Sequence, residues 1–326
     1  MSLLEVVNLR THFATDRGTV RAVDGVSFTL DDGEVLGLVG ESGSGKSVTA
    51  LSIMRLVREP PGRISADRLV FDGIDLLQAQ PQELRALRTA RIAIVFQDPM
   101  RSLNPVLTIG RQLTETLRRH QGLDAKPAAR RAVKLLEMVG IPSAAKRLTA
   151  YPHQFSGGMR QRVMIAIALS CNPRILIADE ATTALDVTIQ AQIVDLVKRL
   201  TREMGTAVIW ISHDLGLVAG FCDVVNVMYA GRIVEAGPVR DVFQRPSHGY
   251  TLGLMSCTPR VDLVGQPLTP IEGLPPNLME PIRLCPFLPR CRVSVGACAS
   301  VLPPARAISP GHSASCHADL RAHWRG

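Results

Sequence analysis

One octapeptide has the residue types and the spacing of a phosphate-binding loop. It reads Gly40-Glu41-Ser42-Gly43-Ser44-Gly45-Lys46-Ser47 and fits the pattern G-x-x-x-x-G-K-[S/T]. Backbone N–H groups of such a loop surround an anion at a helix N-terminus. Lys46 can then reach the β- and γ-phosphates, and the Ser47 hydroxyl can ligate Mg²⁺. The pattern predicts nucleoside triphosphate binding by Ser42, Gly43, Ser44, Gly45, Lys46 and Ser47.

Two adjacent acids, Asp179 and Glu180, follow the apolar run Ile175-Leu176-Ile177-Ala178. The run reads as a buried strand, and a carboxylate at its end can hold Mg²⁺ directly or through water. On an extended strand, successive side chains face different directions, so Glu180 is expected to point away from Asp179. That placement suits a general base for the attacking water. The alternative for such a pair is a solvated strand end.

Other polar residues also stand at the ends of apolar segments. Gln97 follows the strand-like run 91–96, and His213 follows the run 208–212. By themselves, such residues are most often a surface amide and a structural histidine. Ser156-Gly157-Gly158 opens a helical segment, where free N–H groups and the positive end of the helix dipole favour an anion. The same turn can also act simply as a helix cap.

The elements around these residues indicate an α/β protein. Val35–Val39 reads as a buried strand and Ser47–Leu56 as a helix, which is the context that a phosphate loop requires. Strands near 3–7 and 26–30 suggest an antiparallel edge. Apolar residues three and four apart predict helices over 111–120, 128–139 and 190–204. The alternation of helices with β-branched strands predicts a parallel sheet wrapped by helices.

Composition and charge narrow the class of protein. The chain has 326 residues and is 46% hydrophobic, yet no apolar run approaches the roughly 18 residues that span a bilayer. The N-terminal segment 1–7 lacks the features of a signal peptide, so a cytoplasmic chain is expected. The formal net charge of +8 divides into +5 over 1–240 and +3 over 241–326. Because the positive charge is spread so evenly along the chain, we predict no nucleic-acid-binding groove. Polyphosphate binding, nearby anionic lipid or a solvated Arg-rich surface can account for it.

The C-terminal stretch differs from the rest of the chain in proline and cysteine content. Of the 22 prolines, 11 lie between Pro259 and Pro310, which predicts mostly loops and turns. Four cysteines there have the spacing C-x5-C-x6-C-x17-C: Cys285, Cys291, Cys298 and Cys316. Disulfides are disfavoured in the cytosol, so this group suggests a tetrahedral metal site that replaces a hydrophobic core. Cys171, Cys222 and Cys257 are scattered and read as small buried hydrophobes.

Taken in order, these motifs resemble those of the ATP-binding-cassette (ABC) family. The resemblance covers residues 3–240 and includes Phe155-Ser156-Gly157-Gly158-Met159, Thr183-Ala184-Leu185-Asp186 and the segment from Val208 to Asp214. It implies a P-loop ABC ATPase core with an antiparallel edge and a helical subdomain inserted over about 98–165. A single cassette and no internal repeat argue against a translation-associated factor with two cassettes. The predicted helices are too short for the long coiled coil of a chromosome or repair ATPase.

The resemblance also implies a role for each site residue. Glu180 would be the catalytic base, His213 would contact the γ-phosphate, and Gln97 would contact Mg²⁺ or water and begin a loop that touches the membrane subunits. Ser156, Gly157 and Gly158 would bind the γ-phosphate held by the opposite subunit of a head-to-tail dimer. Asp186 would lie at the dimer interface. Phe13 is the best candidate for the aromatic ring that stacks on adenine.

The C-terminal segment 241–326 resembles the extension of ATPases from dipeptide, oligopeptide and nickel importers. The residues that carry this likeness are Pro246-Ser247-His248-Gly249-Tyr250-Thr251, Pro286-Phe287-Leu288-Pro289-Arg290-Cys291 and Cys316-His317. Gly249 departs from the family, which usually has proline there. In the dipeptide branch the cysteines are thought to hold a [4Fe–4S] cluster. Because four thiolates suit either metal, zinc is an alternative, as are metal-free thiols.

The resemblance identifies the chain as the ATP-hydrolysing subunit of an ABC importer for dipeptides or oligopeptides. It implies ATP and Mg²⁺ as ligands and a peripheral position on the cytoplasmic face of the cell membrane. The implied partners are a second, homologous ABC ATPase, two transmembrane permease subunits and an extracytoplasmic solute-binding protein. Nickel or another small solute, and a soluble ABC ATPase without a transport role, remain the alternatives.

Overall fold

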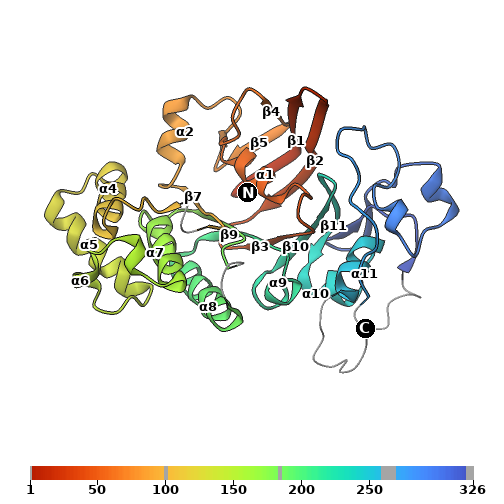
Figure 1. Cartoon of the computed structure of the whole chain (residues 1–326). Helices are drawn as coiled ribbons and strands as arrows, with labels where there is room; N and C mark the ends of the chain where they lie inside the picture. The colour runs from red at the N-terminus through yellow and green to blue at the C-terminus, as the bar shows by residue number, and fades with distance from the viewer. Residues whose placement is uncertain (1, 99–101, 183–185, 258–268, 321–326) are drawn as a thin grey trace. The chain divides into compact units, whose positions relative to one another are not determined.

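The computed structural model describes residues 2–98, 102–182, 186–257 and 269–320 (Figure 1). It divides into two compact units. Unit 1 comprises Met1–Asp31, Val35–Gln78 and Ser212–Gly326, and unit 2 comprises Asp32–Glu34 and Ala79–Ile211. Residues 183–185 of the motif Thr183-Ala184-Leu185-Asp186 lie outside the described residues, as do residues 99–101 of the predicted helical subdomain. Each unit is an α/β structure with its own buried core.

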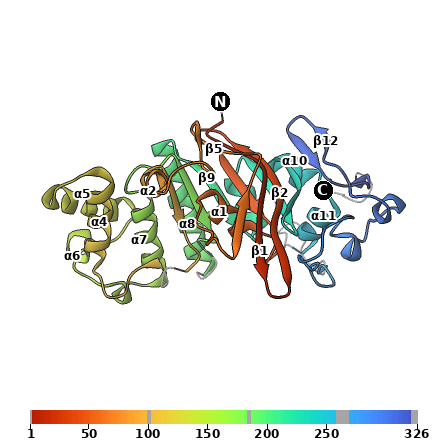
Figure 2. The same ribbon diagram turned by 90° about the horizontal axis from the view of Figure 1, so that it is seen from above.

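Unit 1 contains an antiparallel sheet with the strand order β2-β1-β5-β6, in which β4 also pairs with β1. The strands are β1 (Leu4–Thr15), β2 (Gly18–Leu30), β4 (Gly62–Ser65), β5 (Arg68–Phe71) and β6 (Ile74–Asp75). β1 and β2 form a long hairpin, whose two arms lie side by side in Figure 2. The predicted antiparallel edge is therefore present, with longer strands than its two apolar segments suggested.

A second set of strands in unit 1 has the order β12-β13-β11-β10-β3. They are β3 (Val35–Val39), β10 (Val224–Tyr229), β11 (Arg232–Pro238), β12 (Arg306–Ser309) and β13 (His312–Ala314). β3 is parallel to β10 and fully buried, as its continuous apolar sequence predicted. β13 pairs antiparallel with β11 through Glu235 and Ala236. The C-terminal segment thus adds strands to a sheet of unit 1.

The helices of unit 1 flank these strands. They are α1 (Lys46–Ile53), α9 (Leu215–Phe221), α10 (Val239–Gln244) and α11 (Gly249–Ser256). The predicted helix Ser47–Leu56 ends earlier than expected, because Arg55 adopts a positive φ of 52° and cannot continue it. Short 3₁₀ turns, Leu288–Arg290 and Gly296–Ala299, interrupt the Pro-rich segment. Much of that segment has no regular structure, as its proline content predicted.

Unit 2 combines three parallel strands with a group of helices. The strand order is β9-β8-β7, with β7 (Ile92–Val95), β8 (Ile175–Asp179) and β9 (Ala207–Ser212). The helices are α2 (Pro81–Leu87), α4 (Ile109–Gln121), α5 (Ala125–Met138), α6 (Ala144–Arg147), α7 (Gly157–Leu169) and α8 (Val187–Met204), with a 3₁₀ turn at Pro152–Gln154. The helices α4, α5 and α7 pack against one another. The helices predicted between the strand at 91–96 and the Ser-Gly-Gly turn are present.

Apolar side chains on facing helix sides explain this packing. Leu113 and Leu117 of α4 and Ala132 and Leu136 of α5 are fully buried, and the spacing of four residues places each pair on one helix face. The helix predicted over 190–204 begins earlier, at Val187, because the Asp186 side chain accepts a hydrogen bond from the Ile189 N–H and caps it. In the described part of the chain, no helix is both long and apolar enough to cross a bilayer.

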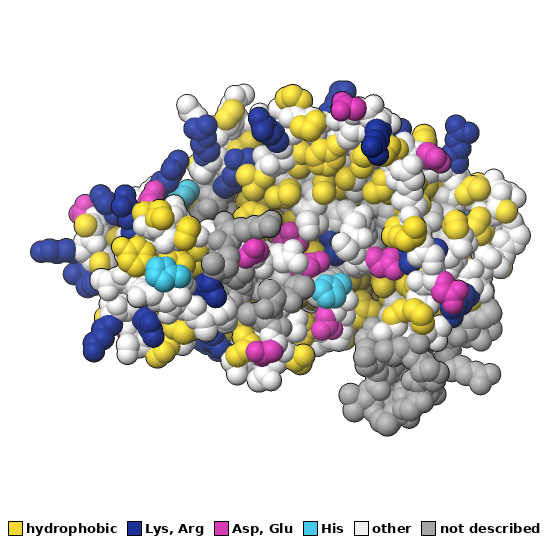
Figure 3. Space-filling view, in the orientation of Figure 1, with side chains coloured by type: hydrophobic (Ala, Val, Ile, Leu, Met, Phe, Trp, Pro, Cys, Tyr) yellow, Lys and Arg dark blue, Asp and Glu magenta, His cyan; other side chains and the backbone are white. Residues whose placement is uncertain are grey.

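Charged side chains on the face of Figure 3 form no single stripe. Lys and Arg side chains lie mainly at the left and along the upper edge of this face, whereas several Asp and Glu side chains lie near its centre and right.

Candidate functional site

The predicted phosphate loop joins β3 to α1 in unit 1, and its lysine holds the loop together. The Lys46 ammonium donates to the Gly40 carbonyl oxygen at 2.7 Å, the Glu41 carbonyl oxygen at 2.9 Å and the Ser44 hydroxyl at 3.4 Å. The Lys46 residue is only 4% exposed. A buried ammonium at the start of a helix is placed where charge-assisted contacts to phosphate are strong.

Two glycines of the loop are required by their surroundings. Gly40 has φ 150°, and a Cβ there would lie 2.2 Å from the Met228 carbonyl oxygen. Gly45 has φ 105°, and its Cβ would lie 2.4 Å from the Ala22 carbonyl oxygen. Gly45 is also the N-cap residue of α1 and has no side chain to cap that end. The loop is therefore a backbone cradle pressed between β2 and β10, as an anion site at a helix N-terminus requires.

In unit 2, the structure brings Gln97 and Glu180 together. The Gln97 side-chain amide donates to the Glu180 carboxylate, with 2.9 Å between Nε2 and Oε2. Asp179 is 8% exposed at the end of β8, where it lies opposite Ile211 of β9. The sequence placed Gln97 and Glu180 at two different strand ends, and the parallel pairing of β7 with β8 puts those ends at one edge.

The expected reason for the direction of Glu180 was wrong. We predicted an extended strand, but Glu180 has φ 48°, in the left-handed region. Its N–H donates to the Ile211 carbonyl oxygen at 3.0 Å, which holds the turn in place. A left-handed conformation in a residue other than glycine costs on the order of 1–2 kcal/mol. This strained backbone, rather than strand alternation, sets the direction of the Glu180 side chain.

The Ser-Gly-Gly turn and Asp186 lie at the starts of two packed helices in unit 2. Ser156 is the N-cap of α7, and its hydroxyl accepts from the Met159 N–H at 3.3 Å. Gly157 and Gly158 form the first turn. A Cβ on Gly158 would lie 2.8 Å from Cγ2 of Ile189 in α8, so the glycine permits the close approach of the two helices. Ser156 and Asp186 are both exposed, as a surface for a partner requires.

Two further predicted residues belong to unit 1. His213 is exposed directly after β9. Phe13 is half-buried on β1, where it pairs with Val20 of β2 and Gly62 of β4. A turn at Asp16-Arg17 closes this hairpin. The antiparallel sheet therefore fixes the position of the Phe13 ring on β1, a position that the sequence indicated only approximately.

All four C-terminal cysteines line one small cavity of unit 1. Cys285, Cys291, Cys298 and Cys316 surround about 10 Å³ of space, roughly the room of one water molecule. Burial, with smaller contributions from the other three cysteines, raises the pKa of the Cys285 thiol to about 11. Burial raises the pKa of Cys291 as well. Among the described residues, however, no three His, Cys, Asp or Glu side chains are arranged to hold a metal ion.

The remaining cysteines lie apart from this cavity. Cys222 is buried beside Gly37, and burial raises its thiol pKa. Cys171 and Cys257 are half-buried, and burial likewise raises the pKa of Cys171. All seven cysteines of the chain are free thiols.

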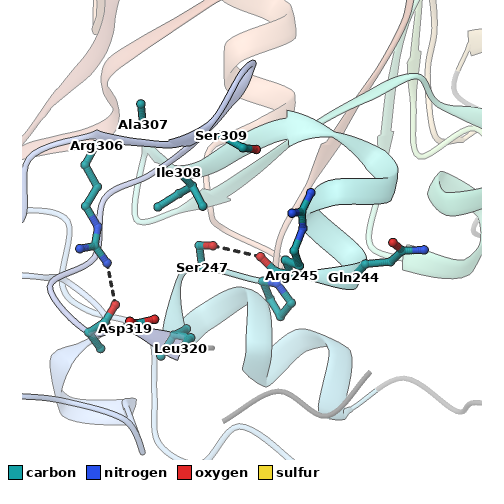
Figure 4. A pocket seen from close by; sticks show the side chains of 11 residues that line it. Gln244, Arg245, Ser247, Arg306, Ala307, Ile308, Ser309, Asp319 and Leu320 are labelled. Atoms are coloured by element: carbon teal, nitrogen blue, oxygen red, sulfur yellow. Dashed lines mark hydrogen bonds between the residues drawn. The ribbon is translucent and has the colours of Figure 1, made fainter. Parts of the chain in front are cut away.

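A larger cavity, of about 500 Å³, lies elsewhere in the C-terminal part of unit 1 (Figure 4). Arg306 on one wall donates to the Ala318 carbonyl oxygen at 2.7 Å, and the Ser247 hydroxyl donates to the Arg245 carbonyl oxygen at 3.0 Å. None of the predicted site residues lines this cavity. It is therefore not the phosphate-binding site.

The structure adds contacts to the phosphate loop that the sequence did not indicate. The Arg290 guanidinium binds the Glu41 carboxylate, and the Tyr250 hydroxyl accepts from the Glu41 N–H at 2.7 Å. Both residues lie within the runs that resemble the peptide-importer extension. No spacing rule links residues that stand 249 positions apart, so only the fold could reveal this contact.

Comparison with known proteins identifies the class to which this loop and fold belong. A family model described as "ABC transporter" matches residues 23–183, and one described as "Oligopeptide/dipeptide transporter, C-terminal region" matches residues 234–298. The chain belongs to the ABC transporter family, as its ATP-binding, ATP-hydrolysing component. The expectation from the motifs is confirmed.

Particular relatives extend the likeness over almost the whole chain. The oligopeptide transport ATP-binding protein OppD of Salmonella typhimurium is 52% identical over 96% of this chain and 93% of its own length. The dipeptide transport ATP-binding protein DppD of Bacillus subtilis is 50% identical over 96% of this chain and 94% of its own. Among solved structures, the dimeric bacterial ABC transporter cassette MJ0796 superposes with a TM-score of 0.65 and 28% identity, covering 73% of this chain and 99% of that chain.

Proposed function

We infer that this chain is the ATP-hydrolysing subunit of an ABC importer for peptides. The observation that carries the inference is identity of about one half, over nearly full length, to ATP-binding proteins of oligopeptide and dipeptide transport. The match of the C-terminal region to a family of oligopeptide and dipeptide transporters supports the same substrate class. Nickel or another small solute is the competing substrate.

The residue roles that we propose follow the geometry within each unit. Glu180 takes a proton from the attacking water, and Gln97 fixes the orientation of its carboxylate through their hydrogen bond. Lys46 binds the phosphates, together with the N–H groups of residues 42–47. Mg²⁺, with Ser47, Gln97 and Asp179 as ligands, would neutralise phosphate charge. His213 contacts the γ-phosphate, and Phe13 stacks on adenine.

We propose that the exposed start of α7 serves a second ATPase subunit. Ser156, Gly157 and Gly158 would bind the γ-phosphate of the partner's nucleotide, and Asp186 would lie at the interface. The dimeric, ADP- and phosphate-bound state of the cassette MJ0796, which is 28% identical to this chain, supports such an arrangement. The partner would be a homologous ATPase. Both would dock on two permease subunits at the cytoplasmic face of the membrane, supplied by an extracytoplasmic solute-binding protein.

We propose that the chain has two parts. Residues 1–240 form the ATP-binding domain, with a helical subdomain at about 98–165, and residues 241–326 form a C-terminal extension. The boundaries of the two family matches, 23–183 and 234–298, support the position of this division.

We further propose that Cys285, Cys291, Cys298 and Cys316 hold a metal group, a [4Fe–4S] cluster in preference to zinc. The donor set supports this, because four thiols converge on one cavity. The geometry supports it less well, because no three described His, Cys, Asp or Glu side chains lie in a metal-binding arrangement. The raised thiol pKa values mean that metal binding would have to release protons.

Reconstitution tests the transport proposal. The subunit, its partner ATPase and the two permeases would be placed in vesicles, and ATP-dependent uptake of a labelled tripeptide would be compared with uptake of Ni²⁺, each with its binding protein. Peptide uptake that is lost with Lys46→Ala supports the proposal. Uptake of nickel alone, or ATP hydrolysis with no transport, contradicts it.

Metal analysis of the anaerobically purified full chain tests the cysteine proposal. A brown protein with iron and acid-labile sulfide in comparable amounts is expected. Changing any one of the four clustered cysteines to serine should bleach the colour, whereas Cys222→Ser should not. A colourless protein with one tightly bound zinc would contradict the [4Fe–4S] cluster and indicate a zinc site instead. Metal-free protein whose C-terminal segment resists protease equally well in the serine variants would refute both.

A further inference from the structure

A partly buried ion pair joins the C-terminal segment to the phosphate loop within unit 1. Arg290 Nη1 lies 2.6 Å from Glu41 Oε2, and Arg290 Nη2 lies 2.9 Å from Glu41 Oε1. The Arg290 side chain is 5% exposed and that of Glu41 28%. Two parallel bonds between a guanidinium and a carboxylate fix both the distance and the plane of the pair. Hydrogen bonding to Glu41 raises the pKa of Arg290, so the guanidinium stays protonated at every physiological pH.

Other contacts hold Arg290 in this orientation. Its Nε donates to the Glu272 carbonyl oxygen at 3.0 Å, and its Nη1 also donates to the Tyr229 hydroxyl at 3.2 Å. The guanidinium carbon lies 5.9 Å from the ring centroids of both Tyr229 and Phe287. All three nitrogens of the side chain are therefore engaged, and little freedom remains to the arginine.

The backbone of Glu41 is fixed at the same time. Its N–H donates to the hydroxyl of Tyr250, which is fully buried and packs 4.5 Å from Tyr229, centroid to centroid. Its carbonyl oxygen accepts from Lys46 Nζ at 2.9 Å. Glu41 thus lies between the C-terminal segment, which binds its side chain and N–H, and the phosphate-binding lysine, which binds its carbonyl group.

The charge of Glu41 gives this contact a consequence for ligand binding. A carboxylate on a phosphate-binding loop opposes the binding of a polyanion, and the repulsion is strong where water is partly excluded. Arg290 neutralises that carboxylate and turns it towards the C-terminal segment. Tyr250 occupies the Glu41 N–H, so that N–H is not available to a phosphate group.

We propose that Arg290 and Tyr250 are positioning residues for nucleotide binding, through which the C-terminal segment sets the affinity of the phosphate loop for ATP. Arg290 acts by neutralising Glu41, and Tyr250 acts by fixing the Glu41 backbone. Neither touches the nucleotide. This inference rests on the ATP-binding role of the chain. It adds that a segment outside the ATP-binding cassette controls that role.

A double-mutant cycle on the full-length chain tests the charge argument. Arg290→Ala should raise the Kd for a fluorescent ATP analogue on the order of tenfold, within the usual range of coupling between sites. Adding Glu41→Gln to Arg290→Ala should recover most of the lost affinity, because the uncompensated carboxylate is gone. The loss in Arg290→Ala should also shrink as salt rises. An arginine that only stabilised the fold would give additive losses and no recovery.

Matched variants separate this proposal from general damage. Arg292→Ala removes a pair with Glu272 whose side chains are 57% and 81% exposed, and should leave the Kd unchanged. Tyr250→Phe keeps the ring and removes only the hydroxyl, so faster amide exchange over residues 41–46 is expected, with a smaller loss of affinity. Lys46→Ala reports on the ATP-binding role itself.

Three results decide the matter. A Kd for Arg290→Ala within twofold of the parent, with binding lost in Lys46→Ala, overturns the inference and leaves ATP binding standing. Arg290→Ala/Glu41→Gln binding no more tightly than Arg290→Ala overturns the charge argument. Unchanged binding in Lys46→Ala would instead contradict the assignment of the phosphate loop.

Discussion

At the scale of single residues, Glu180 combines two features of a functional side chain. Its left-handed backbone is costly, and its carboxylate is held by Gln97. Strain of this kind persists only where the surrounding structure imposes it, here through the bond from the Glu180 N–H to Ile211. The strained turn therefore marks the same residue that the sequence selected as the base.

Replacing Glu180 with Gln should lower ATP turnover by about 10²–10⁴-fold while leaving ATP binding intact. The amide keeps the shape of the side chain and an acceptor for Gln97, but it cannot take a proton. Turnover and nucleotide affinity would be measured in the assembled transporter. Glu203→Gln is the matched control, because Glu203 is an exposed partner of Arg199 on α8. Near-normal hydrolysis by Glu180→Gln would refute the assignment of the base.

Replacing Lys46 with Ala should weaken nucleotide binding itself. The change deletes a charge-assisted phosphate contact and also three hydrogen bonds within the loop. Calorimetric titration with ATP and Mg²⁺ should show little or no binding, while the melting temperature stays close to that of the parent. Retained affinity would mean that the phosphates are bound elsewhere.

At the scale of elements, the start of α7 depends on its packing against α8. A Cβ on Gly158 would lie only 2.8 Å from Ile189 Cγ2, so any larger residue there would force Ile189 or one of the two helices to shift. α7 also packs against α4 and α5, which bury their apolar side chains in this group of helices. The direction of the Ser156 turn is therefore set by helix packing as well as by its cap.

Replacing Gly158 with Ala should destabilise the chain by about 1–3 kcal/mol through overpacking. Adding Ile189→Ala should recover part of that loss, because the clashing methyl group is removed. Gly220→Ala in α9 is the control, since its Cβ would meet nothing within 4 Å, and a gain of up to about 1 kcal/mol is expected there. Urea denaturation measures all four chains. A Gly158→Ala chain as stable as the parent would contradict the packing described.

At the scale of the whole molecule, we proposed an anion site at the exposed helix start bearing Ser156 and a second one at the phosphate loop. In a head-to-tail dimer, one subunit's loop would meet the other's Ser-Gly-Gly turn, so a single chain would carry only half of each site. Val187, next to Asp186 at the start of α8, is an apolar residue that is 80% exposed.

The isolated chain should accordingly be a poor ATPase. Activity per molecule should rise with protein concentration and steeply on addition of the partner ATPase and the permeases, because each complete site needs two subunits. Initial rates over a dilution series check this. Full activity that is independent of concentration in the purified chain would refute the half-site arrangement.

The sequence by itself determined the local features of this protein. The phosphate loop, the buried strand Val35–Val39 and the helices near 111–120 and 128–139 follow from short-range rules of composition and periodicity. These rules apply because the residues involved are neighbours along the chain. The family likeness, carried by several such motifs in order, was equally readable.

Only the tertiary structure decided how distant residues meet and how some of them turn. The pairing of Gln97 with Glu180 depends on the register of β7 and β8, and the left-handed φ of Glu180 depends on a bond from the next strand. The Arg290–Glu41 pair spans 249 positions and arises because the C-terminal segment packs against the phosphate loop within unit 1. Propensity and spacing act over a few residues, whereas these contacts are selected by the packing of the complete unit.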